Sequence, residues 1–84
     1  MSYQLPDQLL YSTVNNIFKR MLPIIKHTKV LTIDLSNIKF IDSAGIILLL
    51  EMYCLACKYQ QQIIYINYPP TISSLLQLYS LDFI

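Results

Sequence analysis

Residues 30–50 read VLTIDLSNIKFIDSAGIILLL and carry the strongest structural signal in the chain. Val30 to Leu35 is a nearly continuous run of apolar and β-branched residues, which predicts a strand covered on both faces. A loop then leads to Asp42-Ser43-Ala44-Gly45, where Asp42 or Ser43 can cap a helix that runs to about Tyr59. A buried strand followed by a long apolar helix predicts an α/β fold.

The segments on the amino-terminal side continue this pattern. Residues 12–27 place most of their apolar side chains on one side of a helix, and Pro23 should end or kink that helix. Residues 3–9 alternate weakly and are interrupted by Pro6, which suits an edge strand or its entrance better than a central strand.

The segments on the carboxyl-terminal side complete an alternating order. Residues 63–67 predict a second buried strand, and Pro69-Pro70 leads into a last helix over about residues 71–80. The order strand, helix, strand, helix, strand, helix predicts a sheet with right-handed crossovers and helices packed on it. No repeat, linker or low-complexity stretch interrupts this order, so residues 1–84 are expected to form a single domain.

The composition favours a small protein that binds another molecule. A domain of 84 residues hides only about 60% of the surface of its unfolded chain, yet 55% of the residues are hydrophobic and 13% are charged. Either the core is unusually rich, or part of the surface is covered by a partner, and we favour the second interpretation. The net charge is +1 and the six basic residues are scattered, so nucleic acid is not an expected partner.

The chain carries no signal for export or membrane insertion. Its first residues, MSYQLPD, lack the basic and apolar regions of a signal peptide. The longest apolar run, residues 46–50, stops at Glu51, and even extended to Cys57 it is far shorter than the roughly 20 residues that span a bilayer. The expected location is the cytoplasm.

Cys54 and Cys57 form a Cys-x-x-Cys pair, a spacing found in redox and metal sites. Redox pairs of this kind usually stand at the start of a helix, whereas these two lie well inside the helix that begins near Gly45. His27 is the only histidine and there is no second cysteine pair, so a closed zinc site would lack ligands. We therefore expect two small core-facing side chains, with no metal site.

The central helix is apolar on almost every side. The face assigned to the core consists of Ile46, Leu49, Leu50, Tyr53, Ala56 and Cys57. A second apolar stripe, roughly opposite, consists of Leu48, Met52, Leu55 and Tyr59. Either a neighbouring helix or a partner protein could cover this stripe, because a helix that is apolar all round is usually buried on more than one side. We favour the partner.

Two short runs in the middle of the chain resemble the STAS domain family. They are Ile33-Asp34-Leu35-Ser36 and, after a loop, Asp42-Ser43-Ala44-Gly45-Ile46 with Leu48-Leu49-Leu50 behind it. The resemblance extends over almost the whole chain and implies an α/β, STAS-like fold of the anti-sigma-factor-antagonist type, in which helices pack on a mixed sheet. Asp7 stands where the family usually has glycine. Nothing before Tyr3 matches the family's first strand, so that strand is expected to be missing and one sheet edge to be exposed.

The same motif separates the branches of this family. In the antagonists of anti-sigma factors, the phosphate-accepting hydroxyl stands immediately before the motif glycine, and here that residue is Ala44, which has none. Ser43 falls where MlaB-type subunits of lipid-transporting ABC complexes carry a serine or threonine needed for function. The resemblance therefore implies the transporter branch and no phosphorylation site.

By this resemblance, the chain is expected to be an accessory subunit and not an enzyme. It would bind the MlaF-like cytoplasmic ATPase of an ABC-type phospholipid transporter that maintains outer-membrane lipid asymmetry, and reach the inner membrane only through that ATPase. No cofactor or nucleotide is expected, because no glycine-rich phosphate loop is present. The expected partner-binding residues are Asp42, Ser43, Ala44, Leu48, Met52, Leu55 and Tyr59, with helix capping as the alternative role of Asp42 and Ser43.

Two other functions stay open at this point. The first is an antagonist of an anti-sigma factor that acts by protein–protein binding. The second is a thiol oxidoreductase that uses Cys54 and Cys57. Other catalysis is not indicated, because no base within reach of Ser43 can be inferred from the chain.

Overall fold

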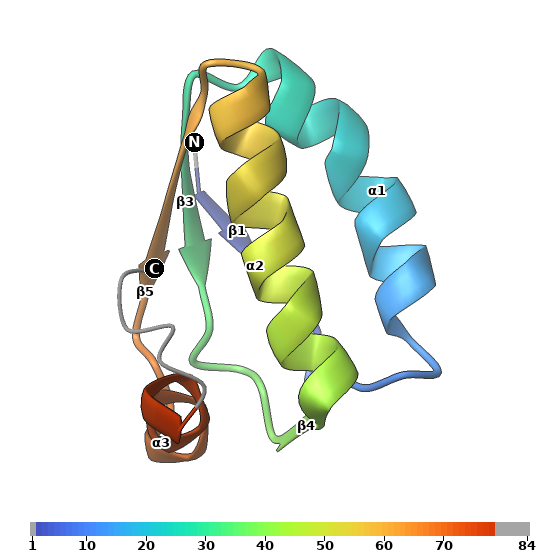
Figure 1. Ribbon diagram of the computed structural model, residues 1–84, viewed down its shortest axis with the longest axis vertical. Helices are drawn as coiled ribbons and strands as arrows, with labels where there is room; N and C mark the ends of the chain where they lie inside the picture. The colour runs from blue at the N-terminus through green and yellow to red at the C-terminus, as the bar shows by residue number, and fades with distance from the viewer. Residues whose placement is uncertain (1, 79–84) are drawn as a thin grey trace.

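The computed structural model describes residues 2–78 (Figure 1). Its main sheet has three parallel strands in the order β1-β3-β5. These strands span Ser2–Gln4, Val30–Asp34 and Gln62–Ile66. A separate parallel pair joins β2 and β4, which span Gln8–Leu9 and Phe40–Ile41.

This topology confirms the expected α/β class, with one difference. The resemblance implied a mixed sheet, whereas every strand pair within residues 2–78 is parallel. The same resemblance left the family's first strand without a counterpart in this chain. β1 lies at the edge of the sheet, as expected for this segment. Pro6 lies between β1 and β2 and belongs to neither strand, because proline cannot donate a hydrogen bond to a sheet.

Three helices accompany the strands. α1, α2 and α3 span Val14–His27, Ser43–Lys58 and Pro70–Leu78. α1 and α2 lie side by side on the sheet, and α3 lies near the carboxyl end of β5 (Figure 1). α1 continues through the exposed Pro23, so an end at this proline is wrong. The expected end of α3 near residue 80 lies outside the described residues. No helix in residues 2–78 is long and apolar enough to cross a membrane.

α1 and α2 cover one face of the main sheet (Figure 1). Along β3, Leu31 and Ile33 are buried, whereas Val30 is 43% exposed. Along β5, Tyr65 is buried and Ile64 is 40% exposed. The prediction that these strands are covered on both faces is therefore wrong. Their apolar residues fall on both sides of the pleat, but α1 and α2 pack against only one of them.

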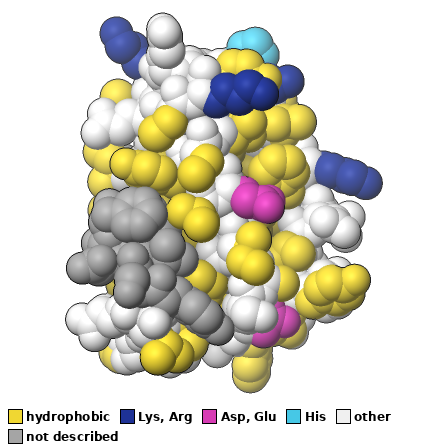
Figure 2. All heavy atoms as spheres, viewed as in Figure 1, with side chains coloured by type: hydrophobic (Ala, Val, Ile, Leu, Met, Phe, Trp, Pro, Cys, Tyr) yellow, Lys and Arg dark blue, Asp and Glu magenta, His cyan; other side chains and the backbone are white. Residues whose placement is uncertain are grey.

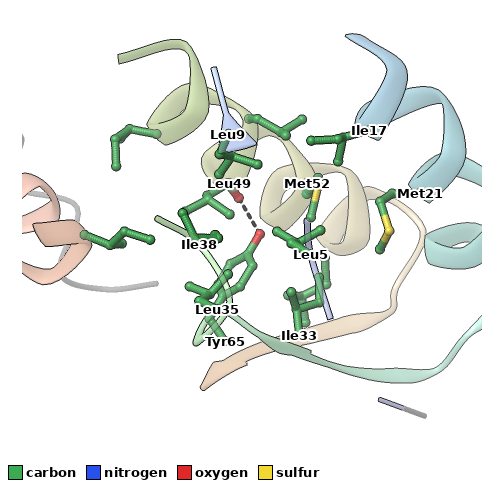
Figure 3. Packing of buried hydrophobic residues seen from close by; sticks show 14 of the residues in the cluster. Leu5, Leu9, Ile17, Met21, Ile33, Leu35, Ile38, Leu49, Met52 and Tyr65 are labelled. Carbon is green, nitrogen blue, oxygen red and sulfur yellow. Dashed lines mark hydrogen bonds between the residues drawn. The ribbon is translucent and has the colours of Figure 1, made fainter. Parts of the chain in front are cut away.

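The core fills the space between the sheet and these helices (Figure 3). Met21 of α1, Ile33 of β3 and Leu49 of α2 are fully buried there. Tyr65 of β5 also reaches into the core, where its hydroxyl donates a 2.7 Å hydrogen bond to the carbonyl oxygen of Leu49. Burial raises the pKa of Tyr65, so the hydroxyl keeps its proton and remains a donor. This bond ties β5 to the middle of α2.

Candidate functional site

The N-terminal end of α2 is built around one carboxylate. Asp42 follows β4 in an extended conformation and is the N-cap of the helix. Its Oδ1 accepts a 3.1 Å hydrogen bond from the N–H of Gly45, and its Oδ2 accepts a 3.0 Å hydrogen bond from the N–H of Tyr11. The predicted cap is therefore present, and the same side chain also holds the loop between β2 and α1 against the start of α2.

The stability that Asp42 supplies should depend on pH. The N–H of Tyr11, more than any other group, lowers the pKa of Asp42 below its ordinary value of 3.8. The ionised carboxylate therefore stabilises the fold fully above that ordinary value, and the contribution is lost as the pH falls through the lower folded-state pKa. Asp42→Asn should melt at a lower temperature than the wild type at neutral pH. This gap in melting temperature should narrow in strong acid, where the wild-type carboxylate is protonated.

Thermal melting followed by circular dichroism across this pH range measures the gap. Asp34→Asn is the matched control for removing a carboxylate charge at a site away from α2. The pKa of Asp34 is also lowered, chiefly by the N–H of Ser36. A gap between wild type and Asp42→Asn that stays constant down to strong acid would show that the carboxylate charge does not hold the two segments together.

Gly45 allows the start of α2 to approach the β2–β4 pair closely. A Cβ atom at this position would overlap the carbonyl oxygen of Leu9 and lie 2.7 Å from Cγ1 of Ile41. The φ angle of Gly45 is not positive, so glycine is required here for space and not for a left-handed backbone. Gly45 and Asp42 together fix where the first turn of α2 lies.

A groove opens beside this first turn. Its volume is about 420 Å³. Its walls include Tyr11, Val14 and Phe18 on the side of α1 and its preceding loop, and Ser43, Ala44 and Ile47 on the side of α2. Tyr11 is 82% exposed and Ile47 is 53% exposed. Figure 2 shows hydrophobic side chains gathered over α1 and α2 on this face. Apolar side chains that stay exposed around a groove are typical of a site that binds another molecule.

The structure corrects the predicted apolar stripe on α2. Leu48 and Met52 are 3% and 0% exposed, and Leu55 is half-buried. This side of α2 faces the core that it shares with α1, to which the buried Ile17 and Met21 belong. The alternative, that a neighbouring helix covers the stripe, is therefore correct for Leu48 and Met52. Met52 is therefore not accessible to a partner in this fold, whereas Leu48 lines the groove with only 3% of its surface exposed.

Tyr59, the last member of that stripe, is 40% exposed and has contacts within the chain. The Nζ of Lys26 lies 5.4 Å from the centroid of the Tyr59 ring, a cation–π distance. Nearby, Nε2 of Gln61 donates a 2.9 Å hydrogen bond to the carbonyl oxygen of Lys26. These contacts join the ends of α1 and α2 that lie opposite the groove, so Tyr59 is not part of the groove.

The outward row of α2 was recognised from the sequence only in part, because Glu51 and Lys58 mark a polar edge of the helix and the other two members were missed. It consists of Ile47, Glu51, Cys54 and Lys58, at the helical spacings i, i+4, i+7 and i+11, and all four are exposed. The two charged residues in this row were the available signal, because charged side chains mark the solvent side of a helix. Cys54 and Cys57 are both exposed, so the prediction that they face the core is wrong.

The chain belongs to the STAS domain family. Residues 4–84 match the family model described as "Mlab, STAS domain", which agrees with the resemblance to MlaB-type members. The match includes the start of α2, where Asp42 caps the helix and Gly45 allows its close approach to β2 and β4. This is the Asp42–Gly45 motif that carried the resemblance.

Two solved structures of SpoIIAA share this fold. The first is the anti-sigma factor antagonist SpoIIAA in its unphosphorylated form, at 21% identity and a TM-score of 0.77, with 93% of this chain and 70% of that chain covered. The second is the Bacillus cell fate determinant SpoIIAA in the phosphorylated form, at 21% identity and a TM-score of 0.74, with 94% and 73% covered. No curated protein sequence matches this chain.

Proposed function

We propose that this chain is a non-enzymatic accessory subunit that binds the cytoplasmic ATPase of an ABC-type phospholipid transporter. The observation that carries the proposal is the match of residues 4–84 to the STAS family described by the name Mlab. In this proposal the chain resides in the cytoplasm and is held at the inner membrane by an MlaF-like ATPase, in a complex that maintains outer-membrane lipid asymmetry.

The groove at the start of α2 supports this docking role. Ser43 is exposed and Ala44 is half-buried at its edge, beside the exposed Ile47. An apolar centre with a polar rim is the usual composition of a protein–protein interface. We assign direct contact to Ser43, Ala44 and Ile47. Asp42 acts as a positioning residue, since both of its carboxylate oxygens are engaged within the chain.

The surroundings of Ser43 support binding over catalysis. Among residues 2–78, no side-chain base forms a hydrogen bond with the Ser43 hydroxyl. A serine hydroxyl without a base within reach is a weak nucleophile. The exposed hydroxyl is therefore assigned to recognition of the partner.

The second candidate function is an antagonist of an anti-sigma factor that acts by protein–protein binding. The likeness in fold to SpoIIAA favours it. Ala44, immediately before Gly45, has no hydroxyl to accept a phosphate, so the exposed Ser43 would have to take that role. At 21% identity the likeness is one of fold, and the family description favours the transporter.

Ser43→Glu tests the docking assignment. The position is exposed, so the domain should stay folded, while a new charge at the groove should weaken the complex. A tagged wild-type copy expressed in the native cell should recover the ABC ATPase. Ser43→Glu should bind the ATPase at least about tenfold more weakly, a loss of about 1.4 kcal/mol or more of binding free energy. Ser74→Glu, an equal change at an exposed position of α3, is the matched control and should recover it normally.

Two results would count against this assignment. Undiminished recovery of the ATPase by Ser43→Glu would remove Ser43 from the docking surface. A stoichiometric phosphate adduct on Ser43, seen in the intact mass of the protein from its native cell, would favour the antagonist, because phosphorylation adds charge in the way a switch requires.

A further inference from the structure

The last three turns of α2 carry a second exposed surface, next to the docking groove. Leu50 and Leu55 are half-buried, and Cys54 is exposed between them. With Glu51, Lys58 and Phe18 of α1 they line a shallow hollow of about 380 Å³, and it shares Phe18 and Glu51 with the docking groove. This surface is open along one side of the helix and is apolar except for those two charges.

The two charges are placed symmetrically about the centre of this surface. Glu51 and Lys58 lie seven residues apart, which is about two helical turns or 10.5 Å along the axis, and both are exposed. Cys54 and Leu55 stand midway between them. Within residues 2–78, neither charge forms an ion pair with another side chain. The pattern therefore reads acidic, apolar, basic along one helix.

We propose that this surface binds a second copy of the chain, with the two α2 helices antiparallel. A two-fold axis midway between Cys54 and Leu55 places Glu51 of each copy opposite Lys58 of the other. The two ion pairs flank a centre made of Cys54 and Leu55 from both copies. Such an interface is isologous, because one patch pairs with itself.

The charge pattern favours a second copy over an unrelated protein. A surface with one acidic and one basic residue about a central apolar pair is complementary to itself when one copy is turned by half a rotation. Charge pairs of this kind fix orientation and partner choice more than they add affinity, and exposed pairs are individually weak. The dimer is therefore expected to be reversible and to dissociate on dilution. Dimerisation requires no ATPase, so experiments on the purified chain test the dimer separately from the proposed function.

Sedimentation equilibrium of the purified chain, over a wide range of concentrations at low salt, tests the dimer. The wild type should show a concentration-dependent rise in mass from monomer to dimer. Glu51→Lys and Lys58→Glu should each raise the dissociation constant about tenfold or more, because like charges then face each other. The double variant Glu51→Lys/Lys58→Glu should recover wild-type association. Lys39→Glu, at an exposed position outside α2, is the matched control for Lys58→Glu and should leave association unchanged.

Thiol crosslinking tests the position of the axis. The Cys57→Ser variant keeps Cys54 close to the axis, so a short bifunctional thiol reagent should trap a dimer. Cys54→Ser should give less of it. A wild type that stays monomeric at every concentration would overturn the proposal. So would a double variant that associates no better than either single variant, or a dimer that Cys54 cannot crosslink. Circular dichroism melts of each variant ensure that a loss of association is not a loss of fold.

Discussion

Met52→Asp should unfold the isolated domain at neutral pH. Met52 is 0% exposed, at the centre of the core between α1, α2 and the sheet. The change removes about 1.5–3 kcal/mol of burial free energy for a side chain of this size. It also places an unpaired carboxylate in an apolar site, which adds a further large cost. A small domain has only about 5–15 kcal/mol of total stability, so the folded population should collapse.

Ile47→Asp is the matched comparison, since it places the same carboxylate on the same helix. Ile47 is 53% exposed, so its variant should keep the wild-type circular dichroism spectrum and a melting temperature close to that of the wild type. Because Ile47 lines the groove, this variant should nevertheless lose the ATPase. A Met52→Asp domain that melts cooperatively near the wild-type temperature would place Met52 at the surface, as the sequence-based stripe implied.

Gly45→Ala should destabilise the domain by about 1–3 kcal/mol, the usual cost of inserting a methyl group into filled space. On an exposed helix this change would be favourable by up to about 1 kcal/mol. The sign reverses here because the new Cβ meets the backbone carbonyl oxygen of Leu9, which cannot rotate away as a side chain can. Urea denaturation of the purified chain measures the difference in unfolding free energy.

Ser43→Ala is the control for Gly45→Ala, because Ser43 is exposed and two residues away in the same first turn. It should stay within a few tenths of a kcal/mol of the wild type, as is usual for surface positions. A Gly45→Ala domain that is as stable as the wild type would mean that the start of α2 can move away from β2. The groove would then have no fixed shape.

Signals confined to a few neighbouring residues predicted local structure well. The β-branched run in residues 30–35 formed β3, and Asp42 formed the expected cap, because both depend on side chains next to one another in the chain. The same holds for α2, whose expected end near Tyr59 is one residue from the observed end at Lys58. The resemblance carried by Ile33–Ser36 and by Asp42–Ile46 also identified the family correctly.

Features that depend on distant parts of the chain were predicted poorly. α2 is apolar nearly all round, so its own sequence does not determine which side faces α1, and Met52 was assigned to the surface in place of Ile47. The side of the sheet that stays open at Val30 and Ile64 depends on where the helices pack. The contact between Gly45 and Leu9 joins segments more than thirty residues apart, and no local pattern encodes it.

Direct binding of the purified chain to the purified ABC ATPase subunit from the same cell tests the central claim most directly. Isothermal titration calorimetry should show saturable binding of this chain to the ATPase subunit. The binding should be lost in Ile47→Asp and retained in Ser74→Glu. Absence of heat and of complex at every concentration, together with tight binding to an anti-sigma factor of the serine-kinase type, would contradict the account.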